Sequence, residues 1–169
     1  FNDLTVAENL MVAMGDSVRY GLAGSILHFP RYAREERIAR ERAEELLSIF
    51  HMEGHADERA GSLPYGAQRR LEILRALASN PCLLLLDEPA AGMNPSETAE
   101  LMENIRRIRD TFQIAVLLIE HDMDLVMNIC EGICVLNFGH IIAKGTPEDI
   151  QRNETVIEAY LGKKKEAAS

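Results

Sequence analysis

The chain has 169 residues, which is enough for one domain with a hydrophobic core, and 47% of them are hydrophobic. The formal charge of −9 disfavours a nucleic-acid partner, because binding a phosphate backbone needs a basic face. No run of about 18 apolar residues occurs, so no membrane-spanning helix is expected. The sequence opens on Phe1, without Met or a secretory signal, and we expect it to be a piece truncated at its N-terminal side.

The first 80 residues are predicted to be mostly helical. A capping-box pattern, Thr5 to Glu8, predicts the start of one helix, and Gly54 is predicted to end another. Residues 15–32 contain three glycines and Pro30, which favour a loop or a broken helix. The predicted helices cover residues 5–14, 33–51 and 66–79. Apolar positions at helical spacing in the second of them are Ile38, Leu46, Leu47 and Phe50.

Strand and helix patterns alternate after residue 81. The predicted strands are 82–86, 114–119, 133–136 and 141–143, and the predicted helices are 95–110, 122–130 and a short one from 146. The residues from Asn137 to His140 predict a hairpin turn. Apolar strands that alternate with helices predict an α/β fold whose parallel sheet is covered on both faces.

Three cysteines, Cys82, Cys130 and Cys134, predict free thiols in a reducing compartment. Cys130 and Cys134 are spaced to share a helix face and a metal ion. No third ligand is placed to complete such a site, so packing in the core is the favoured interpretation.

Two carboxylates, Asp87 and Glu88, follow four leucines at the point where a predicted strand runs out. A carboxylate at such a strand end can hold a metal ion, and the next can orient or deprotonate a water molecule. The alternative is a turn with solvated acids. His121 similarly follows the next apolar strand, and the two strand ends should meet at one edge of a parallel sheet. A lone histidine there is otherwise structural or solvated.

A predicted helix start at Gly66 adds a third piece, because the free N–H groups of a helix start suit phosphate oxygens. Taken alone, it is equally a helix with a basic surface. The ordered segments 62–77, 83–89, 90–95 and 119–122 together resemble the nucleotide-binding subunits of ABC transporters. The chain is most similar to those that energise branched-chain amino-acid uptake. The segments that carry this closer similarity are 4–10, 65–66, 68–73, 120–124, 135–139 and 145–147.

The resemblance implies a role for each matching residue. Asp87 would hold Mg²⁺ through water, Glu88 would polarise the attacking water, and His121 would contact the γ-phosphate. The signature segment, which binds ATP held mainly by the opposite subunit, would be Leu63, Pro64, Tyr65, Gly66, Ala67 and Gln68. The D-loop, which links the two sites across the dimer, would be Ala91, Gly92, Met93 and Asn94.

The chain departs from the family pattern in the signature segment and the D-loop. The usual Leu-Ser-Gly-Gly-Gln has Pro64 in place of Ser, Tyr65 in place of a Gly and Ala67 in place of Gln, and Asn94 replaces the usual D-loop Asp. The larger departure is that no Gly-x-x-x-x-Gly-Lys-Ser/Thr occurs, so the phosphate cradle is not in this sequence.

The resemblance implies a P-loop NTPase-like fold and an ATP-hydrolysing importer subunit at the cytoplasmic face of the plasma membrane. Its cofactors would be ATP and Mg²⁺, and its partners a second ATPase subunit and membrane-spanning permeases, with no nucleic acid. The domains would be a helical signature subdomain (1–80), the second half of a RecA-like core (81–162) and a disordered tail (163–169). One alternative is a non-catalytic piece that serves only for dimerisation or docking. An ABC ATPase of DNA repair or translation is disfavoured by the acidic balance.

Overall fold

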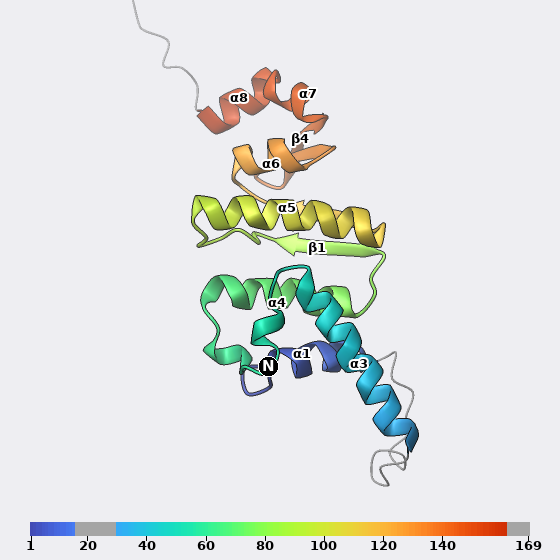
Figure 1. Ribbon diagram of the computed structural model, residues 1–169. Coiled ribbons are helices and arrows are strands. Elements are labelled where there is room, and N and C mark those ends of the chain that lie inside the picture. The colour runs from blue at the N-terminus through green and yellow to red at the C-terminus, as the bar shows by residue number, and fades with distance from the viewer. Residues whose placement is uncertain (16–29, 162–169) are drawn as a thin grey trace, which may run out of the picture. The chain divides into compact units, whose positions relative to one another are not determined.

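The computed structural model describes residues 1–15 and 30–161, and the chain divides into two compact units, Phe1–Ile119 and Glu120–Ser169 (Figure 1). Most of the predicted loop 15–32 and the predicted tail 163–169 lie outside the described residues. Within those residues, no helix combines the length and the apolar character that a bilayer crossing requires.

Three helices that pack on one another form the first part of unit 1: α1 (Val6–Ala13), α3 (Pro30–Ser48) and α4 (Tyr65–Ala78). Two short 3₁₀ helices, η2 (Glu53–His55) and η3 (Ala60–Ser62), connect α3 to α4. The three helices bury a shared set of large side chains, because each carries an apolar stripe at helical spacing. The fully buried side chains include Val6, Leu10, Leu47 and Leu74 on these helices and Phe50 just after α3.

The end of α3 differs from the prediction. The helix stops at Ser48, and the Met52 N–H donates to the carbonyl of Leu47 (2.9 Å) around His51, whose φ is +55°. This is a Schellman-type ending, with His51 in the left-handed position that glycine usually takes. Gly54 therefore lies in η2 and does not end α3. Ile38 was also predicted on the apolar stripe, but it is 49% exposed.

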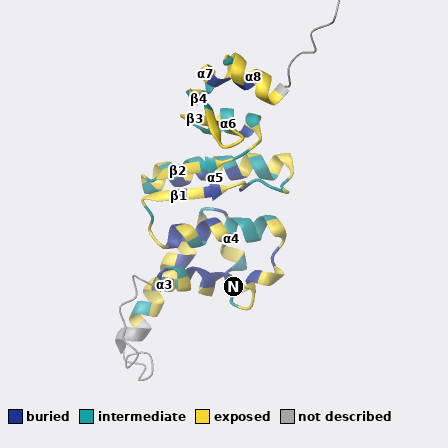
Figure 2. Cartoon of the chain, turned by 180° about the vertical axis from the view of Figure 1, so that it is seen from behind, coloured by how far each residue is buried: buried dark blue, intermediate teal, exposed yellow. Residues whose placement is uncertain are grey.

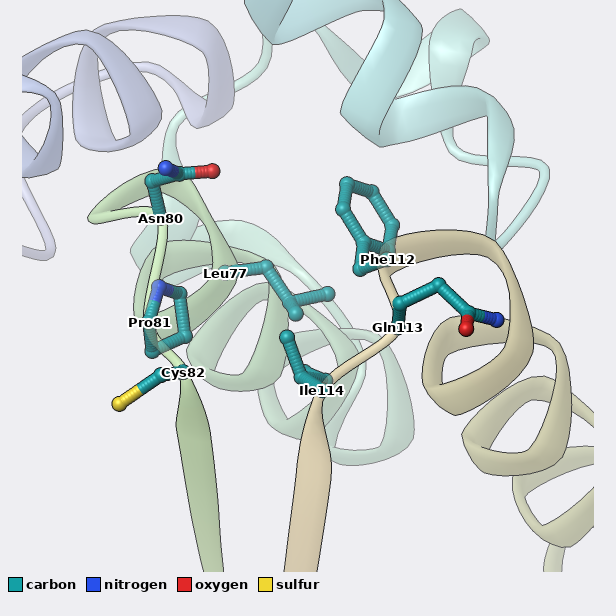
Figure 3. Close-up of a pocket in the computed structure, with 7 residues that line it drawn as sticks. All are labelled: Leu77, Asn80, Pro81, Cys82, Phe112, Gln113 and Ile114. Atoms are coloured by element: carbon teal, nitrogen blue, oxygen red, sulfur yellow. The ribbon is translucent and has the colours of Figure 1, made fainter.

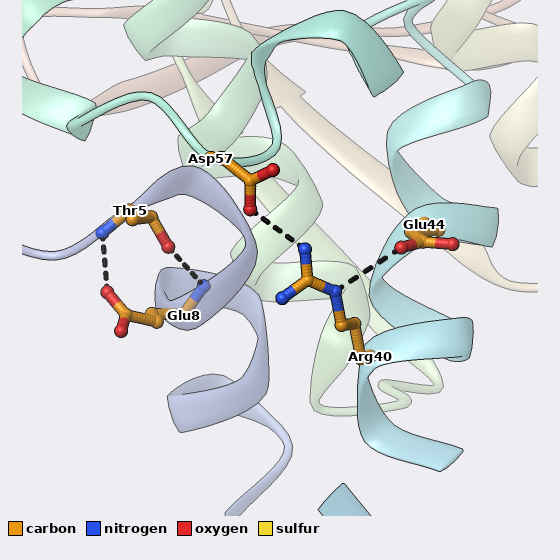
Figure 4. Close-up of polar contacts among 5 residues, drawn as sticks. All are labelled: Thr5, Glu8, Arg40, Glu44 and Asp57. Atoms are coloured by element: carbon orange, nitrogen blue, oxygen red, sulfur yellow. Dashed lines mark hydrogen bonds and ion pairs between the residues drawn. The ribbon is translucent and has the colours of Figure 1, made fainter. Parts of the chain in front are cut away.

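Polar contacts fix the starts and connections of these helices (Figure 4). The predicted capping box is present: the Glu8 N–H donates to Thr5 Oγ1 (3.1 Å), and the Thr5 N–H donates to Glu8 Oε2 (2.8 Å). On α3, Arg40 forms ion pairs with Asp57 (2.8 Å) and Glu44 (3.5 Å). The side chains of Arg40, Glu44 and Asp57 are all exposed, so these ion pairs contribute little to the stability of the fold.

The second part of unit 1 is a parallel strand pair, β1 (Leu83–Asp87) and β2 (Ala115–Ile119), joined by α5 (Pro95–Phe112). The register runs from Leu83 opposite Ala115 to Asp87 opposite Ile119, which confirms the predicted parallel pairing. In Figure 1, α5 lies along β1. The loop after β1 enters α5 through Asn94, which caps the helix ahead of Pro95.

Only one face of this strand pair is covered within the described residues. Leu84 and Leu86 are buried, whereas Leu83, Leu85, Leu117 and Ile119 are exposed (Figure 2). The strands were predicted to be buried on both sides. They alternate instead, because successive side chains point to opposite faces and, among residues 1–15 and 30–161, no second layer covers one of these faces.

Unit 2 contains α6 (Met123–Ile129), the hairpin of β3 (Ile133–Asn137) and β4 (His140–Gly145), α7 (Pro147–Gln151) and α8 (Glu154–Leu161). The predicted hairpin turn is confirmed, with Phe138 and Gly139 both at positive φ. The core of this unit consists of Val135, Ala143, Ile150 and Val156. Helix α8 was not predicted. Its local signal is Asn153, which accepts from the Thr155 and Val156 N–H groups at the helix start.

All three cysteines are free, as predicted. Cys130 follows the end of α6, and Cys134 lies in β3, so the two do not share a helix face. The prediction of core packing is wrong for Cys134, which is exposed. Cys130 is partly buried, and this burial raises the pKa of its thiol. In the part of the chain that the structure describes, no three metal-ligating side chains gather in one place.

Candidate functional site

The carboxyl ends of β1 and β2 meet at one edge, where Asp87 is paired with Ile119. Directly after it, the Glu88 N–H donates to the Ile119 carbonyl (2.9 Å), and Glu88 has a φ of +43°. A non-glycine residue in this region costs on the order of 1–3 kcal/mol, and such strain concentrates at functional sites. Asp87 and Glu88 are both exposed, so their carboxylates are accessible at the edge where the sequence predicts chemistry.

The turn after Glu88 is tightly hydrogen-bonded. The Ala91 N–H donates to the Glu88 carbonyl, and the Met93 N–H to the Ala90 carbonyl, both at 3.1 Å. Asn94 then caps α5: its Oδ1 accepts from the Ser96 and Glu97 N–H groups, both at 3.0 Å. The amide at the usual D-loop aspartate position is therefore engaged in starting a helix.

The segment 63–68 forms the entry to α4. Leu63 is buried, Pro64 is the residue before the helix, and the Gln68 side chain donates to the Leu63 carbonyl (2.9 Å). No side chain of the described residues caps α4, so the N–H groups of its first turn keep no intrahelical acceptor. The other α-helices whose starts are described are each capped by a side chain. The capping residues are Thr5, Asn94, Asp122, Thr146 and Asn153.

The structure brings the segment 63–68 and the turn 91–94 together, which the sequence did not predict. The Tyr65 ring lies against Gly92, and a Cβ on Gly92 would be 3.3 Å from Tyr65 Cε1. The Tyr65 hydroxyl accepts a hydrogen bond from Arg69 Nε (3.0 Å). An ion pair with Glu72 and this bond to Tyr65 raise the pKa of Arg69, which is therefore a permanent cation beside the site.

His121 belongs to unit 2 and precedes Asp122, the cap of α6. Its N–H donates to Glu120 Oε2 (3.2 Å), and its Nδ1 lies 3.8 Å from the same oxygen. The imidazole is exposed. Along the chain it comes two residues after the end of β2, and its approach to Glu88 stays a prediction.

Two depressions lie on unit 1. The larger, about 270 Å³, is lined by Leu77, Asn80, Pro81, Cys82, Phe112, Gln113 and Ile114 (Figure 3). It lies where β1 and β2 begin and is therefore not the predicted site. The smaller, about 150 Å³, contains Asp87 and Pro89 together with Arg69 and Glu72 of α4.

The carboxylate at the strand edge fits a Mg²⁺ site. Asp87 offers a hard carboxylate oxygen, and Mg²⁺ in nucleotide enzymes takes one or two carboxylates and completes its shell with waters and substrate phosphates. A protein cage of several ligands is therefore not required here.

Two protein-family models match the chain. The model described as "ABC transporter" matches residues 1–91, which is more than half of the chain. A second model, "Branched-chain amino acid ATP-binding cassette transporter", matches residues 140–166.

Curated relatives and solved structures extend the comparison. The chain is 47% identical over 162 residues to the high-affinity branched-chain amino acid transport ATP-binding protein LivG of Salmonella typhimurium, covering 96% of this chain and 64% of LivG. It is 45% identical to BraF of Pseudomonas aeruginosa and 37% identical to the lipopolysaccharide export system ATP-binding protein LptB of Escherichia coli. The chain thus spans about 64% of the length of the first two of these relatives.

Among solved structures, the ADP conformation of MJ1267, an ATP-binding cassette of an ABC transporter, superposes with a TM-score of 0.74 at 28% identity. That similarity covers 95% of this chain and 64% of MJ1267. It confirms the predicted α/β fold of the P-loop NTPase type. The family match over residues 1–91, the identity to LivG and BraF and the shared cassette fold together show that this chain belongs to the ABC transporter family.

Proposed function

We propose that this chain is part of the ATP-binding subunit of an importer for branched-chain amino acids, and that the complete subunit hydrolyses ATP. The observation that carries the proposal is Glu88, held in a strained conformation directly after Asp87 at the carboxyl end of β1. The substrate class is that of LivG and BraF, which are branched-chain amino acid transport proteins.

Each element of the site has a chemical task in this proposal. The Asp87 carboxylate would bind Mg²⁺ through water, and that ion would supply charge neutralisation at the phosphates. The exposed Glu88 carboxylate would orient the attacking water and accept its proton. The free N–H groups at the start of α4 would donate to phosphate oxygens, and His121 would donate to the γ-phosphate.

Pro64 removes the hydroxyl that the family pattern places in the signature segment. The contact to nucleotide there would be made by backbone N–H groups at the uncapped start of α4. A second ATPase subunit would present the phosphate cradle to this surface, and permease subunits would dock on the helical part of unit 1. With these partners, the protein would lie at the cytoplasmic face of the plasma membrane.

A second candidate is a non-catalytic module that serves dimerisation or docking only. In that case the complete protein would have no Gly-x-x-x-x-Gly-Lys-Ser/Thr, a motif that these 169 residues do not contain. A Gly-rich lysine loop upstream in the full gene would decide for the ATPase.

The test is uptake by reconstituted transporter. The complete subunit is assembled with its permease subunits in proteoliposomes, and ATP-dependent uptake of labelled leucine is compared with that of lysine. Glu88→Gln should abolish both hydrolysis and leucine uptake while ATP binding persists. Glu103→Gln, an exposed glutamate on α5, is the matched control and should retain both. Hydrolysis without leucine uptake would reject the importer assignment, and normal hydrolysis by Glu88→Gln would reject the assigned site.

A further inference from the structure

We propose that Tyr65 is a positioning residue whose ring fixes the turn 91–94 to the start of α4. The two segments then move as one body within unit 1. The contact itself depends only on the geometry, whereas its consequence for catalysis rests on the function proposed above.

The Tyr65 ring lies beside Gly92 in the turn 91–94. A Cβ added to Gly92 would be 3.3 Å from Tyr65 Cε1 and 4.0 Å from Cδ1 and Cζ. The edge of the ring therefore occupies the space beside Gly92 that a side chain would take, and a larger residue there would have to push the ring aside. Gly92 also has a φ of +76°, which disfavours any side chain there.

Arg69 holds the Tyr65 ring in place. Tyr65 is 51% exposed, so burial alone does not fix its orientation. Arg69, one turn further along α4, donates from Nε to the hydroxyl (3.0 Å), and its guanidinium carbon lies 5.3 Å from the ring centroid. Arg69 is held in turn by Glu72 at 2.7 Å. Tyr65 is thus held by Arg69 of its own helix while its ring edge lies beside Gly92.

The same two segments also lie close together at a second place. A Cβ on Gly66 would be 3.5 Å from Glu97 Oε1, while Glu97 Oε2 accepts from the Asn94 N–H (2.9 Å). The carboxylate that closes the cap of α5 therefore lies beside the second residue of α4. The two segments therefore approach each other at two places, which is the geometry expected if they move together.

This contact depends on a departure from the family pattern. Tyr65 stands where the usual pattern has glycine, which has no side chain to reach Gly92. Loss of the ring should therefore release the turn without removing any group proposed to touch nucleotide. The effect belongs in kcat, because the alignment of the turn matters once nucleotide is bound.

The first experiment is hydrogen exchange on the complete, nucleotide-free subunit. In Tyr65→Ala, we expect the amides of Ala91 and Met93 to exchange about tenfold faster, because their hydrogen bonds lie in the released turn. Tyr65→Phe keeps the ring edge and should restore most of the protection. Tyr160→Ala, at a tyrosine of similar exposure (48%) on α8, should leave both amides unchanged. Unchanged exchange in Tyr65→Ala would overturn the contact.

The second experiment separates the ring contact from backbone strain. Gly92→Ala introduces both, whereas Gly139→Ala has the same strain (φ +78°) and nothing within 4 Å of its Cβ. Gly92→Ala should lower the unfolding midpoint more than Gly139→Ala does, and Tyr65→Ala should relieve that excess in the double variant. An equal effect of the two alanines would count against the ring contact.

The third readout is steady-state ATP hydrolysis. Tyr65→Ala should lower kcat about tenfold with KM changed less than about threefold, and Tyr65→Phe should recover it. Faster exchange with an unchanged kcat would overturn the positioning role. If the unmutated complete subunit hydrolyses no ATP, the proposed function fails, and the exchange experiment alone decides the contact between Tyr65 and the turn.

Discussion

Neighbouring leucines on β1 provide a direct test of which face of the strand pair is covered. Leu84 is 2% exposed and Leu85 is 65% exposed. Truncating a fully buried leucine to alanine costs about 3–5 kcal/mol, as transfer and cavity terms combined. Only about a third of Leu85 is covered, which leaves roughly 0.7 kcal/mol from the ordinary value of about 2 kcal/mol for burying leucine. We therefore expect Leu84→Ala to destabilise the 169-residue chain by at least about 2 kcal/mol more than Leu85→Ala does.

Urea unfolding followed by circular dichroism at 222 nm measures both costs, since the chain has no tryptophan for fluorescence. The urea dependence should be unchanged in both variants, so that the shift in midpoint reports stability. In a subunit of the relatives' full length, further sequence can supply a second layer, and the cost of Leu85→Ala should rise toward that of Leu84→Ala. Equal costs in the 169-residue chain would show that the assigned faces of β1 are wrong.

Three further results are expected. His121→Ala in the complete subunit should slow hydrolysis about 100-fold, or roughly 3 kcal/mol, with an unchanged melting temperature; early melting with normal specific activity would assign the histidine a structural part. The 169-residue chain should bind Mg-ATP weakly or not at all in calorimetry, because the phosphate cradle is not in its sequence, and micromolar binding would contradict this. Hydrogen bonds from the backbone and then the side chain of Thr146 hold the pKa of Asp149 below its ordinary value, so its stabilising effect is present at neutral pH and lost as the pH falls through that lowered pKa. Asp149→Asn should remove this acid-range loss in unfolding midpoints, whereas parallel losses in both proteins would show no contribution from the carboxylate.

Elements with local signals could be predicted from the sequence. The capping box at Thr5 fixes the start of α1, Pro95 marks the start of α5, and Pro147 marks that of α7. Each signal acts within one helical turn, so no distant contact is needed to interpret it. The prediction of where α3 ends failed, because His51 and not Gly54 has the left-handed conformation. The residue type alone does not indicate this.

Packing across the sequence could not be predicted in the same way. An apolar run such as Leu83–Leu86 is compatible with burial on one face or on two, and the number of layers over a sheet is a tertiary property. The Asp87–Glu88 edge followed from the strand pattern, because parallel strands end together. The proximity of Tyr65 to Gly92 brings together segments that precede and follow β1 in the sequence. The only local signal for it is a tyrosine at a glycine position of the family pattern.

The proline at the start of α4 has an entropic consequence. Pro64 has a φ of −56°, near the value its ring imposes, and Leu63 before it has the extended conformation (φ −67°, ψ 147°) that a following proline requires. The Gln68 side chain closes the segment onto the Leu63 carbonyl. A chain restricted in this way loses few conformations when a partner docks on it, so less of the binding free energy is spent on ordering. If this segment binds nucleotide as proposed, binding there should carry a smaller entropic penalty than at a segment with the usual serine.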